Sequence, residues 1–94
     1  VSSYEFNFRV FPNPFNNITT ISFDVLDNLP TLLTIYNLMG QPVRTIKKDQ
    51  FSLGTNQIKW NGKNDAGFEL PTGIYFAELA SKNFSQVQKI MLLK

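Results

Sequence analysis

The chain has 94 residues, which corresponds to one domain with a single core. Its net charge of +2, carried by dispersed lysines and arginines, is too small for an electrostatic nucleic-acid partner. Cysteine and histidine are absent, which excludes disulfides, thiolate or histidine metal sites, and histidine-dependent nucleophilic catalysis within this chain. We therefore expect no catalytic residue, no metal site and no cofactor.

Alternation of apolar and polar residues, the period of a half-buried strand, is present from the start of the chain. Residues 4–10 alternate in this way and predict a first strand. Two prolines within 12–14 then end it, because proline has no N–H to donate to a ladder. The chain begins with Val1 rather than Met, so we interpret it as a piece of a longer polypeptide whose linker ends within residues 1–10.

Further strands follow, separated by clusters of turn-forming residues. In the next strand Ile21, Phe23 and Val25 share one face, and this face is expected to be buried. Residues 61–67 include glycines and asparagines, which tolerate positive φ, and therefore predict a loop. The expected strands after the first cover 19–25, 31–38, 43–46, 55–60, 74–79 and 86–93.

About seven short strands without helical periodicity are typical of a small antiparallel β-sandwich. The fold class predicted is therefore all-β, as one sandwich domain over 1–94 with no disulfide.

The final apolar strand is flanked by Lys89 and Lys94, which has two interpretations. In the first, the lysines keep an aggregation-prone edge strand from pairing with other chains. In the second, a partner recognises the strand by edge pairing, with the lysines as charge anchors.

Six sequence blocks resemble, in order and with similar spacing, the type A C-terminal sorting domain of the type IX (Por) secretion system. The blocks are FPNPFN at 11–16, TTISF at 19–23, IYNLMGQPV at 35–43, WNGKNDAG at 60–67, PTGIYF at 71–76 and KIMLLK at 89–94. The resemblance covers 11–94, and residues 1–10 match it poorly. The departures are Phe11 where the family has tyrosine, Asn17 where proline is common and Asn61 where aspartate is common.

The resemblance implies an immunoglobulin-like sandwich, similar to a domain of the flagellar hook-capping protein. It also implies a function: the domain directs a covalently attached upstream cargo across the outer membrane of a Gram-negative bacterium, to the cell surface or the medium. The implied partners are the outer-membrane translocon and a sortase-like peptidase that cuts near or before Val1.

The resemblance also suggests roles for individual residues. The residues expected to contribute to translocon recognition are Lys89, Ile90, Leu92, Lys94, Gly73 and Tyr75. The motif residues expected to have structural roles are Pro12, Asn13, Pro14, Gly40, Trp60, Gly62, Asp65 and Gly67.

Three alternatives stay open at this point. A carbohydrate-binding or spacer sandwich would need aromatic residues in a row, and the candidates Phe51, Phe68, Phe76 and Phe84 fall in different elements. The loop 61–67 resembles a calcium loop only loosely, because Asp65 is its one carboxylate, and a turn is expected there instead. Exposed edge strands would permit weak self-association.

Overall fold

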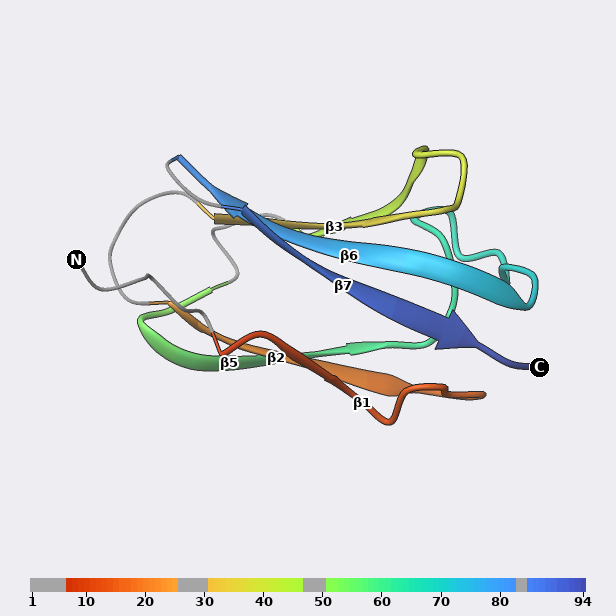
Figure 1. Ribbon diagram of the computed structural model, residues 1–94, viewed down its shortest axis with the longest axis horizontal. Coiled ribbons are helices and arrows are strands. Elements are labelled where there is room, and N and C mark those ends of the chain that lie inside the picture. The colour runs from red at the N-terminus through yellow and green to blue at the C-terminus, as the bar shows by residue number, and fades with distance from the viewer. Residues whose placement is uncertain (1–6, 26–30, 47–50, 83–84) are drawn as a thin grey trace.

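Two antiparallel sheets pack face to face in the computed structural model, which describes residues 7–25, 31–46, 51–82 and 85–94 (Figure 1). The strands are β1 (Arg9–Phe11), β2 (Thr19–Val25), β3 (Thr31–Tyr36), β4 (Pro42–Ile46), β5 (Gly54–Trp60), β6 (Gly73–Ser81) and β7 (Ser85–Leu92). One sheet has the order β1-β2-β5 and the other β4-β3-β6-β7. The predicted all-β antiparallel sandwich is confirmed.

The core lies between the sheets because alternate residues of each strand point inward. In β2, the predicted inward residues Ile21, Phe23 and Val25 are all buried. The opposite sheet contributes buried residues by the same alternation, namely Leu33, Ile35, Tyr75, Ala77, Leu79, Ile90 and Leu92. Trp60, at the end of β5, is also buried.

Several strand boundaries differ from the predicted ones. The first ladder begins at Arg9 and continues to Phe11, although the buried Phe8 precedes it. The third strand ends at Tyr36, two residues early, because the side-chain oxygen of Asn37 accepts hydrogen bonds from the N–H groups of Met39 and Gln41 and forms a turn. Residues 4–6 of the predicted first strand, Phe84, and the segments 26–30 and 47–50 between predicted strands lie outside the described residues.

The segment 12–16 leaves the three-stranded sheet after β1 and reaches the outer edge of β7. Phe15 forms an isolated parallel β-bridge with Leu92 there, and the Phe15 N–H donates to the Met91 carbonyl at 2.9 Å. The Leu93 N–H donates to the Phe15 carbonyl at 2.8 Å. This crossing joins the two sheets along one side of the sandwich.

Candidate functional site

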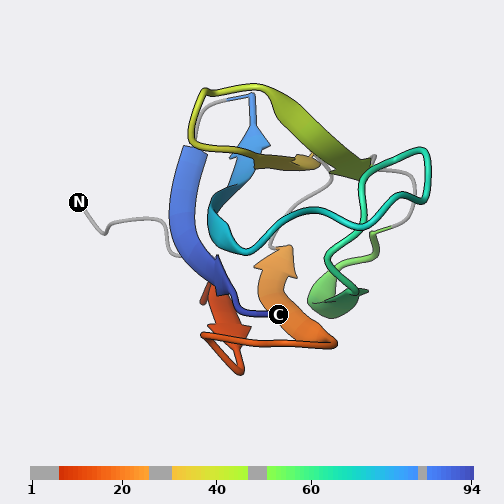
Figure 2. The same ribbon diagram turned by 90° about the vertical axis from the view of Figure 1, so that its right-hand side faces the viewer.

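Five of the six motif blocks contribute residues to one end of the sandwich, and the sixth, at 19–23, begins beside it. The pairs Thr19 with Trp60 and Gly73 with Leu92 place the start of β2, the end of β5, the start of β6 and the end of β7 at this end. We call it the motif end and define it as residues 11–18, 37–41, 61–72 and 93–94. Figure 2 views the molecule from this side, with the loops gathered around the C-terminus.

The described chain enters at the opposite end of the sandwich. The Asn7 side-chain amide donates to Asp24 at 2.7 Å, near the far end of β2. Five residues of extended strand separate Asp24 from Thr19, which corresponds to about 17 Å. The hydrogen bonds from Asn7 and Thr55 hold the pKa of the Asp24 carboxyl below its usual value. The described chain therefore begins away from the motif end.

Three aromatic side chains form the floor of the motif end. The Trp60 ring lies 5.5 Å from that of Phe15 and 5.7 Å from that of Tyr75, measured between ring centroids. The Trp60 indole N–H donates to the Lys63 carbonyl at 2.9 Å, and the Tyr75 hydroxyl donates to the Pro71 carbonyl at 2.7 Å. Burial raises the pKa of Tyr75, so it stays neutral at physiological pH. Buried aromatic rings therefore fix the backbone of the surrounding loops.

Gly62 allows the loop 61–67 to approach β7 closely. Its φ of +76° is a left-handed conformation, and a Cβ atom there would lie 3.3 Å from Cδ2 of Leu92. Gly40 and Gly67 also have positive φ, in turns with open space around them. A Cβ at Gly73, in contrast, would meet no atom within 4 Å, so packing does not require glycine at that position.

The C-terminal residue is held against the neighbouring loop. The Lys94 ammonium lies 2.8 Å from a carboxylate oxygen of Glu69, and the Lys94 N–H donates to the Thr72 hydroxyl at 2.9 Å. The hydrogen bond and the positive charge of Lys94 lower the pKa of Glu69. Both partners of this ion pair are exposed, so it orders the tail more than it stabilises the fold.

The six residues predicted to contribute to recognition fall into two groups. Ile90, Leu92 and Tyr75 are buried in the core and face away from solvent. Lys89 and Lys94 are exposed, and Gly73 is half-buried. Direct contact with a partner is therefore available to the second group, whereas the first group supports the surface from beneath.

The loop 61–67 uses its side-chain oxygens for its own structure. Asp65 Oδ1 accepts from the Arg44 guanidinium at 2.9 Å and from the Thr45 N–H at 3.2 Å, and these contacts lower the pKa of Asp65. The Asn64 side-chain oxygen accepts from the N–H groups of Ala66 and Phe68. Within the described ranges, no three His, Cys, Asp or Glu side chains lie together as metal ligands.

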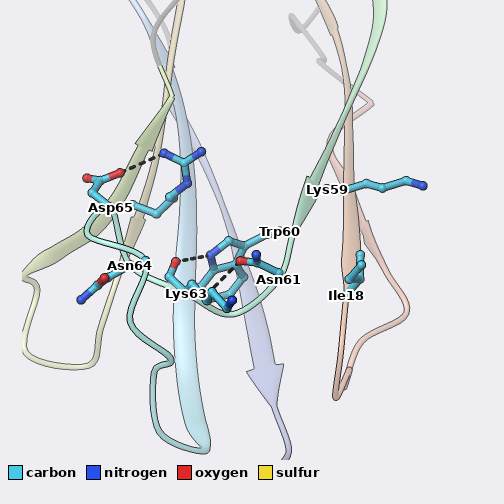
Figure 3. Close-up of a pocket in the computed structure, with 9 residues that line it drawn as sticks. Ile18, Lys59, Trp60, Asn61, Lys63, Asn64 and Asp65 are labelled. Atoms are coloured by element: carbon cyan, nitrogen blue, oxygen red, sulfur yellow. Dashed lines mark hydrogen bonds and ion pairs between the residues drawn. The ribbon is translucent and has the colours of Figure 1, made fainter.

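A shallow groove of about 370 Å³ lies between this loop and the start of β2 (Figure 3). Ile18 and Lys59 line one side of it, and Asn64, Asp65 and Lys63 line the other.

Exposed apolar side chains concentrate at the motif end. Phe68 is 70% exposed and Met39 is 80% exposed, and both lie in loops there. Of the nine large apolar residues exposed in the described part of the chain, six belong to the motif end: Phe11, Ile18, Leu38, Met39, Phe68 and Leu93. Clustered exposed apolar side chains mark interaction surfaces in soluble domains.

Sequence patterns missed two residues: Arg44 of β4, which pairs with Asp65, and Glu69, which pairs with Lys94. Asn13 was expected to be structural, but its hydrogen bonds to β7 were not predicted. The only signal for Asn13 was its place between two prolines in a motif, and nothing local marked Arg44 or Glu69. The described residues include no helix that is long and apolar enough to cross a membrane.

Comparison with known proteins identifies the family. The family model for the secretion system C-terminal sorting domain matches residues 9–93. An endo-acting ulvan lyase from Formosa agariphila is 33% identical over 86 residues. The match covers 92% of this chain and 14% of the lyase, so the chain corresponds to a small part of that protein.

Solved structures show the same fold at low sequence identity. PorZ, a surface component of the type IX secretion system of Porphyromonas gingivalis, matches with a TM-score of 0.68 and 17% identity, over 93% of this chain and 11% of PorZ. Latent PorU from the same organism matches with a TM-score of 0.66 and 20% identity, over 92% of this chain and 9% of PorU.

Truncated FlgD from Helicobacter pylori matches with a TM-score of 0.59 and 20% identity, over 93% of this chain and 70% of FlgD. At these identities the structural matches establish the fold, and the family match establishes the kind of domain. The chain belongs to the family of secretion system C-terminal sorting domains, which direct exported proteins to the cell surface or the medium through type IX secretion.

Proposed function

We propose that the outer-membrane machinery of type IX secretion reads the motif end of this domain while the upstream cargo remains attached at the opposite end. The observation that supports this is the concentration of exposed apolar side chains and of the Lys94 tail at the motif end. The motif end lies about 17 Å along β2 from the point where the described chain begins, so an attached cargo would not have to cover it.

The proposed recognition surface is composite, because it combines loops far apart in the sequence. Lys94 is held by Thr72 and Glu69, and Phe15 is held by Met91 and Leu93. These contacts exist only in the folded sandwich. A complementary receptor surface would be mostly apolar, with an acidic group for a lysine ammonium. In this proposal Ile90, Leu92 and Tyr75 act through the fold, and Lys89, Lys94 and Gly73 act by contact.

We further propose that the domain has no catalytic function and that a sortase-like peptidase removes it by cutting near or before Val1. The two carboxylates of the motif end, Asp65 and Glu69, already pair with Arg44 and Lys94. The second candidate function, carbohydrate binding, has less support. Phe51 is partly buried and packs edge-on against the core residue Phe23, with the ring centroids 4.9 Å apart, so it does not form an exposed aromatic row with Phe68.

A fusion experiment tests the proposed function. A reporter with a signal peptide is fused in front of residues 1–94 and expressed in a bacterium with type IX machinery, with and without a functional translocon. We expect the reporter outside the cell only when the translocon works. A reporter that stays periplasmic in both strains contradicts the proposal.

Replacing Lys89 and Lys94 with serine separates recognition from folding. Both side chains are exposed, so the variant is expected to stay folded and to lose export. If the folded variant is exported as well as the parent, the two lysines have no role in recognition.

A further inference from the structure

The outward edge of β7 is fully hydrogen-bonded near the motif end, although β7 is the last strand of its sheet. The Asn13 side-chain amide donates to the Lys89 carbonyl at 2.7 Å, and its carbonyl oxygen accepts from the Met91 N–H at 2.9 Å. Phe15 then accepts from Leu93 and donates to Met91, as described above. Four successive outward backbone groups, three in β7 and the fourth the Leu93 N–H just beyond it, are therefore occupied by the chain itself.

The opposite edge of the same sheet, β4, is occupied in a similar way. The Asp65 N–H donates to the Val43 carbonyl at 2.9 Å, and Asp65 Oδ1 accepts from the Thr45 N–H at 3.2 Å. The Arg44 guanidinium donates to the Thr45 carbonyl at 3.2 Å. Pro42, at the start of β4, has no N–H to offer.

We propose that Asn13 and Asp65 are edge guards, which keep a second copy of this domain from adding a strand to the four-stranded sheet. Each residue binds one C=O and one N–H group two residues apart on an edge strand. These are the groups that a neighbouring strand needs for pairing. Asn13 satisfies them with its side chain alone, and its backbone does not extend the ladder.

The edge guards explain how the chain can place an apolar strand at the edge of a sheet without pairing with other chains. The end of β7 and the residue after it form the apolar run 90–93 at a sheet edge, and such edges are templates for pairing between chains. The core requires Ile90 and Leu92, so their hydrophobicity cannot be reduced. Occupying the backbone groups of the edge removes the template without changing the core. This inference goes beyond the proposed function and does not depend on it.

The decisive variant is Asn13→Ala, with Asn37→Ala as its matched control. Both substitutions remove an asparagine that makes two or more hydrogen bonds at the motif end; Asn13 is exposed and Asn37 is half-buried. Asn37 acts inside the β3–β4 turn, so its loss opens no edge. Sedimentation velocity over a concentration series is expected to show self-association of Asn13→Ala, tighter than that of the parent by roughly ten- to thirty-fold. Asn37→Ala is expected to behave as the parent does.

A rescue variant tests whether β7 is the edge that pairs. Adding Met91→Pro to Asn13→Ala removes the exposed Met91 N–H, which a second strand would need. The double variant is expected to be monomeric again. A folded Asn13→Ala that associates no more than the parent overturns the proposal for β7, and so does association that Met91→Pro leaves unchanged.

Asp65→Ala provides an independent test at the other edge if Asn13→Ala does not fold. It frees the Thr45 N–H on β4 and is expected to promote self-association that Met91→Pro does not reverse. If neither single variant associates more tightly than the parent, the guard proposal is wrong.

Discussion

Leu92→Ala is expected to destabilise the domain strongly, because Leu92 is fully buried where β7 meets Gly62 and Phe15. Removing a buried leucine costs about 2–5 kcal/mol through lost transfer energy and the cavity left behind. The whole domain is expected to have only about 5–14 kcal/mol of stability, at 0.05–0.15 kcal/mol per residue. A loss of about 3 kcal/mol would lower Tm by roughly 10–25 °C in a domain of this size.

Leu93→Ala is the matched control, since Leu93 is the adjacent residue and is 46% exposed. A surface substitution of this kind usually changes stability by about 0.5 kcal/mol or less. Urea unfolding followed by the fluorescence of Trp60, the single and buried tryptophan, measures both variants. A loss below about 1 kcal/mol in Leu92→Ala, or equal losses in both variants, would refute the assignment of Leu92 to the core.

Two further predictions concern Gly62 and three exposed or partly exposed carboxylates, Asp24 of β2 and Asp65 and Glu69 of the motif end. Gly62→Ala combines an unfavourable φ with a close approach to Leu92, so the free energy of unfolding should fall by about 1–3 kcal/mol. Gly67→Ala is the control, because its Cβ would meet open space and only the unfavourable φ would reduce stability. Equal losses in the two variants would exclude the contact with Leu92. The folded-state pKa values of Asp24, Asp65 and Glu69 are lowered, so the stability that these carboxylates contribute is present above their unfolded pKa, near 4. It is lost as the pH falls from about 4 through the lowered folded-state values. Urea unfolding between pH 7 and pH 2 at constant ionic strength should show this decline, and Asp65→Asn should make it shallower; an unchanged slope in Asp65→Asn would contradict the proposed contacts of Asp65.

The strands were predictable because burial on one face of a sheet imposes a period of two on the sequence. This period located β2 with the bounds that the structure has, and it placed Ile21, Phe23 and Val25 on the buried face of that strand. The family motifs likewise mark positions where the backbone is constrained. Gly62, for example, has a positive φ and lies close to Leu92.

Contacts between distant segments were not predictable in the same way. Asn13 bonds the Lys89 carbonyl across 76 residues, and Arg44 pairs with Asp65 across 21 residues. Local periodicity contains no information on which strands become neighbours, so the occupied edge of β7 could not be derived from it. The early end of β3 depends on the Asn37 side chain, a turn signal that competes with strand alternation.

Reversing one charge at each end of the sandwich tests the central claim, that the secretion machinery recognises the motif end during export. Lys94→Glu changes the motif end, and Lys82→Glu changes the opposite end, just beyond β6. Secretion of the reporter fusion is measured for both variants, after Trp60 fluorescence has confirmed that each is folded. The account predicts that Lys94→Glu reduces secretion strongly and that Lys82→Glu leaves it near the parent level. Equal secretion of the two folded variants would contradict it.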